Sequence, residues 1–116
     1  MSGRPAANAE RTMIRKAFLM TLRPGQQAEY ERRHNPIWPE LQAVLKAHGV
    51  HRYSIFLDRR TDTLFACADI ESEERWAAIA ETEVCRRWWA HMAELMETNP
   101  DQSPLAVPLD EVFRLE

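Results

Sequence analysis

The segment 14–22, with the sequence IRKAFLMTL, is apolar on both of its alternating faces from Ala17 onward. Neighbouring side chains of a β-strand point to opposite faces of its sheet. One face of this segment carries Phe18, Met20 and Leu22, and the other carries Ala17 and Leu19. A strand with this pattern needs cover on both sides, so we expect the chain to form a sheet that is buried on two faces.

The rest of the chain supplies three more extended segments and three helical segments in a fixed order. Strands are expected at 51–57, 63–70 and 111–116, and helices at 26–33 with a restart at 39–48, at 73–80 and at 83–97. The turn residues DRRTD join the two middle strands as a hairpin, and Ser72 and Thr82 are expected to cap the last two helices. The order β-α-β-β-α-β predicts an α+β, ferredoxin-like fold with an antiparallel sheet.

The helices of such a fold cover one face of the sheet and leave the other open. Because an apolar sheet face would be a large exposed patch, we expect a second copy of the chain to cover it. A homodimer that packs sheet on sheet, a dimeric α/β barrel, does this with one two-fold axis.

The length of 116 residues fits one domain, which we expect to span residues 13–116. The first twelve residues are polar and rich in alanine, without apolar periodicity. We therefore expect residues 1–12 to be a flexible extension that precedes the domain.

Composition argues against several classes of function. The net charge is −3, and the basic residues are interleaved with acidic ones, which argues against a nucleic-acid partner. No apolar run approaches the roughly 20 residues of a membrane span, and no signal-peptide core is present. Cys67 and Cys85 stand apart from any zinc-binding spacing, so no metal is expected, and they favour reduced thiols in a cytoplasm.

The stretch 30–40, YERRHNPIWPE, interrupts a helical pattern with Pro36 directly beyond a histidine. Tyr30 and His34 are four residues apart, so they share one side of the first helix. We interpret the break as a bend that presents His34 to a pocket. The alternative is that Tyr30 only packs and that His34 only complements the helix dipole.

Other candidates carry weaker signals. Trp88 and Trp89 diverge by about 100° on a helix, so one can pack in the core while the other reaches past it as a platform for a sugar. The alternative is that both only fill space. The HGVH run at 48–51 lacks the acidic or thiol neighbours of a metal site. Asp69, near the end of a strand, is a further polar candidate.

Seven segments resemble the L-rhamnose mutarotase family in order and spacing, from Met13 to about Leu115. They are MIRKAF, EYERRHNPIWPEL, VLKAHG, ESEERW, CRRWW, NPDQSP and EVFRL. The resemblance implies a dimeric ferredoxin-like enzyme that interconverts the α and β anomers of L-rhamnose without a cofactor. It also implies that His34 is the proton donor and that Tyr30, Tyr53, Trp88 and Trp89 bind the sugar.

The chemistry of anomer exchange agrees with these residue types. The ring oxygen must gain a proton while the anomeric hydroxyl loses one, and a histidine can exchange protons near neutral pH. Two other classes remain open on this scaffold. One is a cofactor-independent monooxygenase or haem-handling protein, and the other is a sugar-binding module without catalysis.

Overall fold

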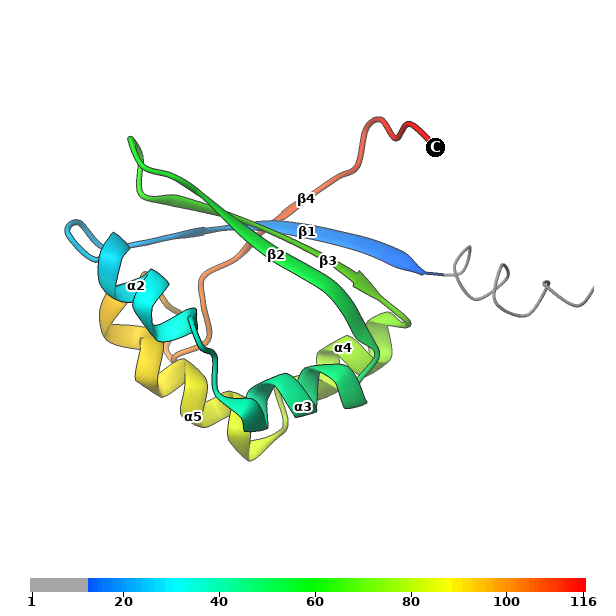
Figure 1. Ribbon diagram of the computed structural model, residues 1–116, viewed down its shortest axis with the longest axis horizontal. Coiled ribbons are helices and arrows are strands. Elements are labelled where there is room, and N and C mark those ends of the chain that lie inside the picture. Colours follow the sequence, from blue (N-terminus) through cyan, green and yellow to red (C-terminus); the bar gives the residue numbers. More distant parts are fainter. Residues whose placement is uncertain (1–12) are drawn as a thin grey trace, which may run out of the picture.

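The computed structural model describes residues 13–116, and the extension expected at residues 1–12 lies outside them. Four α-helices cover one face of a four-stranded antiparallel sheet (Figure 1). The strands are β1 (Ile14–Thr21), β2 (Val50–Asp58), β3 (Thr63–Ile70) and β4 (Val107–Leu109). The helices are α2 (Gln27–His34), α3 (Pro39–Ala47), α4 (Glu73–Ile79) and α5 (Glu83–Met92), followed by the 3-10 turn η1 (Ala93–Leu95). The strand order β2-β3-β1-β4 and the order of the elements confirm the predicted ferredoxin-like fold.

Local signals in the sequence set the ends of the helices. Ser72 accepts a hydrogen bond from the backbone N–H of Arg75, and Thr82 accepts one from the N–H of Cys85, so both predicted N-caps are confirmed. Gly49 ends the α3 turn with a φ of 80°, and a Cβ there would lie 2.9 Å from the Cβ of Glu71. Only glycine meets both conditions at this position.

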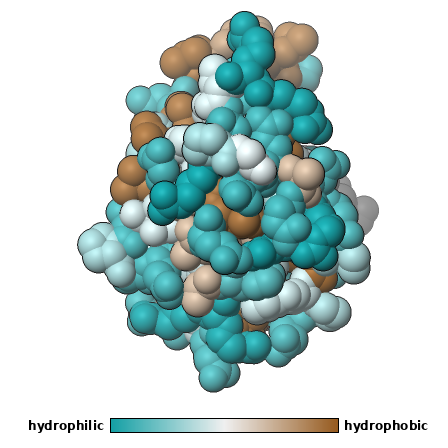
Figure 2. Space-filling view, turned by 90° about the vertical axis from the view of Figure 1, so that its left-hand side faces the viewer, coloured by the Kyte–Doolittle hydropathy of each residue, from teal (hydrophilic) through white to brown (hydrophobic). Residues whose placement is uncertain are grey.

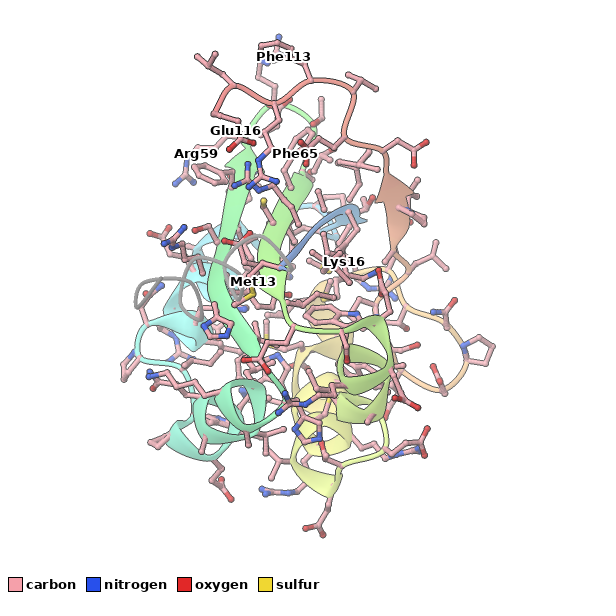
Figure 3. The ribbon with its side chains drawn as sticks, turned by 90° about the vertical axis from the view of Figure 1, so that its right-hand side faces the viewer. Met13, Lys16, Arg59, Phe65, Phe113 and Glu116 are labelled. Atoms are coloured by element: carbon pink, nitrogen blue, oxygen red, sulfur yellow. The ribbon has the colours of Figure 1, made fainter. Side chains whose placement is uncertain are left out.

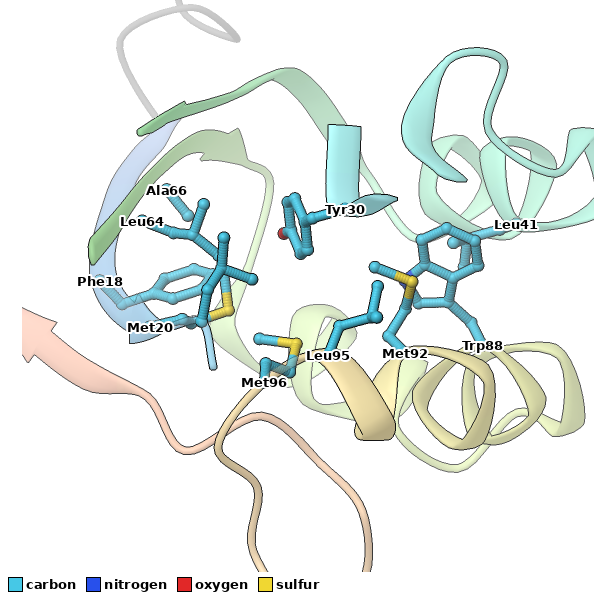
Figure 4. Packing of buried hydrophobic residues seen from close by; sticks show 11 residues of the cluster. Phe18, Met20, Tyr30, Leu41, Leu64, Ala66, Trp88, Met92, Leu95 and Met96 are labelled. Atoms are coloured by element: carbon cyan, nitrogen blue, oxygen red, sulfur yellow. The ribbon is translucent and has the colours of Figure 1, made fainter. Parts of the chain in front are cut away.

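The core lies between the sheet and the helix layer. Phe18 and Met20 of β1 face the helices, as their alternation predicted, and pair across the sheet with Ala66 and Leu64 of β3. Figure 4 shows these residues opposite the apolar stripe of α5 and η1. That stripe comprises Trp88, Met92, Leu95 and Met96, all of them buried.

The last strand is not where the sequence predicted it, and the prediction of a strand at 111–116 is wrong. Leu22, just beyond the end of β1, forms a bridge with Met96. The chain therefore returns to β1 soon after α5, and it pairs with β1 through Val107 and Leu109, before it reaches residue 111. The expected strand was the last segment of the chain, but the length of the connection decides which residues reach β1. The expected long helix 83–97 also ends sooner, at Met92, where the chain tightens into η1.

The outer face of the sheet, opposite the helices, remains apolar. Phe56 is 67% exposed and Phe65 is 42% exposed, and both point away from the helix layer. Figure 2 shows hydrophobic residues gathered toward the upper part of the molecule, whereas the helical part below is mostly hydrophilic. Within residues 13–116, none of the helices has the length and apolar content needed to span a bilayer.

Candidate functional site

A cavity of about 1300 Å³ lies between the sheet and the helix layer. The five residues singled out from the sequence all line it, namely Tyr30, His34, Tyr53, Trp88 and Trp89. They come from three elements, because α2 supplies the first two, β2 supplies Tyr53, and α5 supplies the tryptophans. The fold therefore brings together residues that are up to 59 positions apart in the sequence.

His34 is the last residue of α2, directly before the break at Asn35 and Pro36. Its Nδ1 lies 3.0 Å from the backbone carbonyl oxygen of Tyr30. A carbonyl can only accept, so Nδ1 carries a proton, and in the neutral ring Nε2 is left with a free lone pair. Among the described residues no hydrogen bond to Nε2 is formed, so this nitrogen is available to a ligand.

Burial sets the protonation states of the site. It lowers the pKa of His34 below its usual value, although the hydrogen bond to Tyr30 partly offsets this effect. Burial also raises the pKa of Tyr30 and that of Tyr53 far above the usual range for phenols. Near neutral pH the site therefore combines a neutral imidazole with two protonated phenols, that is, a base and two O–H donors.

Aromatic rings surround the imidazole of His34. Its ring lies 4.3 Å from the ring of Tyr30, centroid to centroid, and meets Trp88 edge-on at 5.1 Å. Figure 4 shows Tyr30 between the sheet residues and the helix bearing Trp88. Trp88 is only 8% exposed, whereas Trp89 is partly buried, so the two neighbours do differ in burial. Both still line the same cavity.

Two further tryptophans pack against these aromatic residues, and the sequence did not single them out. Trp38 meets Trp88 edge-on at 5.1 Å and lies 5.3 Å from the ring of His91. Trp76 lines the cavity, with its ring 6.0 Å from that of Tyr53. The position of Trp38 within the interrupted stretch was a signal, whereas nothing in the short helix around Trp76 marked it.

Arg33 fastens the C-terminal end of α2 to α5 and η1. Its guanidinium donates to the carboxylate of Glu29 at 2.6 Å, to the backbone carbonyl of His91 at 2.5 Å and to the carboxylate of Glu94 at 2.7 Å. The side chain of Arg33 is only 13% exposed, whereas that of Glu94 is 68% exposed. The bonds to His91 and Glu94 join residues 58 and 61 positions apart in the sequence, and they hold Arg33, the neighbour of His34, in place.

Other candidates lie outside the cavity or have partners elsewhere. Asp69 is on the outer face of the sheet beside Arg15 and Arg52, so it does not line this cavity. His48 bonds through Nδ1 to the carbonyl of Val44. His51 lies 2.8 Å from a carboxylate oxygen of Glu71. The part of the chain that the structure describes holds no group of three or more His, Cys, Asp or Glu side chains arranged for a metal ion.

The fold and the cavity define a ferredoxin-like protein with a half-buried, titratable histidine on the wall of an aromatic cavity. The model of one family, described as L-rhamnose mutarotase, matches residues 15–115, and the chain belongs to that family. The sequence resemblance is thereby confirmed.

Known relatives extend this result. The chain is 61% identical over 104 residues to the L-rhamnose mutarotase of Yersinia pestis, a match that covers 90% of this chain and 100% of the relative. It is similar to the crystal structure of an L-rhamnose mutarotase from Formosa agariphila, with a TM-score of 0.82 and 45% identity over 89% of this chain and 99% of that one. A candidate antibiotic biosynthesis monooxygenase from Nitrosomonas europaea has a TM-score of 0.61 at 12% identity, covering 88% and 92%, and shares the fold alone.

Proposed function

We propose that this protein interconverts the α and β anomers of L-rhamnose within the cavity lined by His34. The observation that carries the proposal is the arrangement of His34, whose Nδ1 is tied to the carbonyl of Tyr30 while Nε2 stays available. Membership of the L-rhamnose mutarotase family and the names of its close relatives support this choice of substrate.

The reaction needs two proton transfers. On ring opening the bond between C1 and the ring oxygen breaks, the ring oxygen keeps the electron pair and gains a proton, and the anomeric hydroxyl loses its proton. The product is the open-chain aldehyde. Rotation about the C1–C2 bond and the reverse steps then give the other anomer.

In the proposed mechanism neutral His34 accepts the proton of the anomeric hydroxyl at Nε2. The imidazolium donates that proton to the ring oxygen as the bond between C1 and the ring oxygen breaks. During closure Nε2 takes a proton back from the same oxygen, and the imidazolium donates it to the new anomeric oxygen, which is the donor role that the family resemblance implies. Tyr30 and Tyr53 stay protonated because burial raises the pKa of each, so their phenols serve the sugar as O–H donors. Trp88 and Trp89 supply ring faces for the C–H groups of the sugar.

Saturation-transfer NMR on the anomeric protons of L-rhamnose tests the activity. With protein present, we expect exchange to be faster than in buffer alone. Sugar binding without faster exchange would instead favour a binding module. A visible haem spectrum of the purified protein, with no effect on the anomers, would favour the haem-handling alternative.

We also propose that two copies pack sheet on sheet and form a dimeric α/β barrel. The outer face supports this, because Phe56, Phe65, Leu19 and Val107 pair across the four strands in one apolar row. Arg15, Arg52 and Asp69 lie at one end of this face as a polar rim. Light scattering is expected to give twice the 13.5 kDa mass of the chain, and a monomer at micromolar concentration would contradict the dimer.

We also propose a cytoplasmic location, because the two cysteines are free thiols that are not paired with each other.

A further inference from the structure

The last seven residues of the chain, 110–116, follow β4 without joining the sheet. Their sequence, DEVFRLE, contains three large apolar side chains. Val112 is 91% exposed, Phe113 is 77% exposed and Leu115 is 85% exposed. Large apolar residues grouped in this way on a surface mark a contact with another molecule.

The direction of this C-terminal tail, residues 110–116, indicates where that contact lies. In Figure 1 the tail rises from the face of the sheet that is opposite the helices. Figure 3 shows Phe113 beyond Phe65, on the side away from the helix layer. The tail therefore points away from the cavity and the core, toward the space above the outer face of the sheet.

That space is occupied by the second copy if the proposed dimer forms. Stacked sheets lie about 10 Å apart, and seven extended residues reach up to about 25 Å. The tail is thus long enough to cross the interface and pass along the partner's sheet. It is continuous with the apolar outer face, because it follows directly on the exposed residues Val107 and Leu109 of β4.

We propose that the tail of each copy packs against the sheet of the other copy, with Phe113 as its anchor. This inference rests on the proposed dimer and not on the proposed catalysis. Two-fold symmetry makes the contact reciprocal, so each dimer buries both tails. The three apolar side chains are then buried in the assembly, and the tail stabilises the sheet-on-sheet interface.

Photo-crosslinking tests which molecule the tail contacts. Phe113→p-benzoylphenylalanine is introduced into unlabelled protein, which is mixed and re-equilibrated with ¹⁵N-labelled wild-type protein before irradiation. We expect crosslinked dimers in which unlabelled tail peptides are joined to ¹⁵N-labelled sheet peptides. The same probe at Glu83, which is exposed at the start of α5, is the control and should give far fewer crosslinked dimers.

A second measurement follows the dimer itself by dilution with light scattering. Phe113→Ser should raise the dimer dissociation constant at least about tenfold, as expected for an apolar anchor of an interface. Arg114→Ser, beside it on the tail, should change the constant little, because Arg114 pairs only with Glu116 among the described residues. Circular dichroism checks that both variants remain folded.

The outcomes separate this proposal from the others. Crosslinks confined to single chains, or an unchanged dissociation constant for Phe113→Ser, would overturn the tail contact while leaving the dimer in place. A wild-type monomer would overturn both the tail contact and the dimer. Anomer exchange is measured on the same samples, so a dimer with crosslinked tails but no activity would contradict the proposed catalysis alone.

Discussion

The imidazole ring of His34 lies against the phenol ring of Tyr30, with centroids 4.3 Å apart and planes tilted by 33°. The same two residues are joined by the bond from Nδ1 of His34 to the carbonyl of Tyr30. Both contacts follow from a spacing of four residues on α2. The helix therefore orients its own terminal histidine and decides which ring nitrogen is left for a ligand.

Replacing His34 should abolish most of the catalysis and leave the fold intact. A positioned acid–base group contributes about 10² to 10⁴ in rate, so His34→Ala should slow anomer exchange at least about tenfold after allowance for rescue by buffer. His48→Ala is a matched control, since His48 makes the same bond to a carbonyl four residues earlier but does not line the cavity. Exchange is measured by saturation transfer, with circular dichroism as the folding control. A folded His34→Ala protein with wild-type exchange would remove the residue from the mechanism.

The pH dependence follows from the lowered pKa of His34. If neutral His34 is the active form, the protein-dependent exchange rate should be constant above pH of about 6.5 and fall at lower pH, with its midpoint below that value. The buffer rate is measured and subtracted at each pH. A rate that instead rises on acidification would identify the imidazolium as the active form.

The same group links stability to pH. Because the folded state binds the proton at His34 more weakly than the unfolded state does, its contribution to stability is fully present above a pH of about 6.5. That contribution is lost as the pH falls through the folded pKa. His34→Gln should therefore make denaturant unfolding less sensitive to acid than in the wild type. Equal acid sensitivity of the two proteins would count against burial as the cause of the shift.

The two neighbouring tryptophans should separate binding from stability. Trp88→Ala removes a buried ring and should cost about 3–5 kcal/mol of unfolding free energy, whereas Trp89→Ala removes a partly buried ring and should cost clearly less. Both variants should bind L-rhamnose more weakly, since both rings line the cavity. Urea titration and sugar titration measure the two effects. If both variants were equally destabilised and bound L-rhamnose as tightly as the wild type, the two tryptophans would have only a packing role.

Arg33 should support the site through the position of α2. Arg33→Met removes the ties to His91 and Glu94 and should lower both the unfolding free energy, by about 1–3 kcal/mol, and the exchange rate. Arg32→Met is the matched control, because Arg32 is 71% exposed and bonds only to Glu29 of its own helix among the described residues. The pH profile of exchange distinguishes a displaced imidazole from simple destabilisation. Identical profiles and rates in the two variants would contradict a positioning role.

The sequence by itself determined most of the elements and several of their ends. Strong local signals did this, such as the caps Ser72 and Thr82, the break at Pro36 and the alternation along β1. The side of α2 shared by Tyr30 and His34 was also readable, because a spacing of four is a property of any helix. The family resemblance predicted that Tyr53, Trp88 and Trp89 bind the sugar. In the structure all three residues line the same cavity.

Only the tertiary structure decided what depends on contacts between distant segments. The last strand lies at 107–109 because Leu22 and Met96 fix where the chain returns to β1, and no pattern within 111–116 contains that information. The contacts of Trp38 with Trp88 and of Trp76 with Tyr53 depend on how the helices and the sheet pack together. The strand register likewise places Asp69 on the outer face of the sheet, outside the cavity. The lowered pKa of His34 likewise arises from burial, which the chain acquires only when its sheet and helices close around the ring.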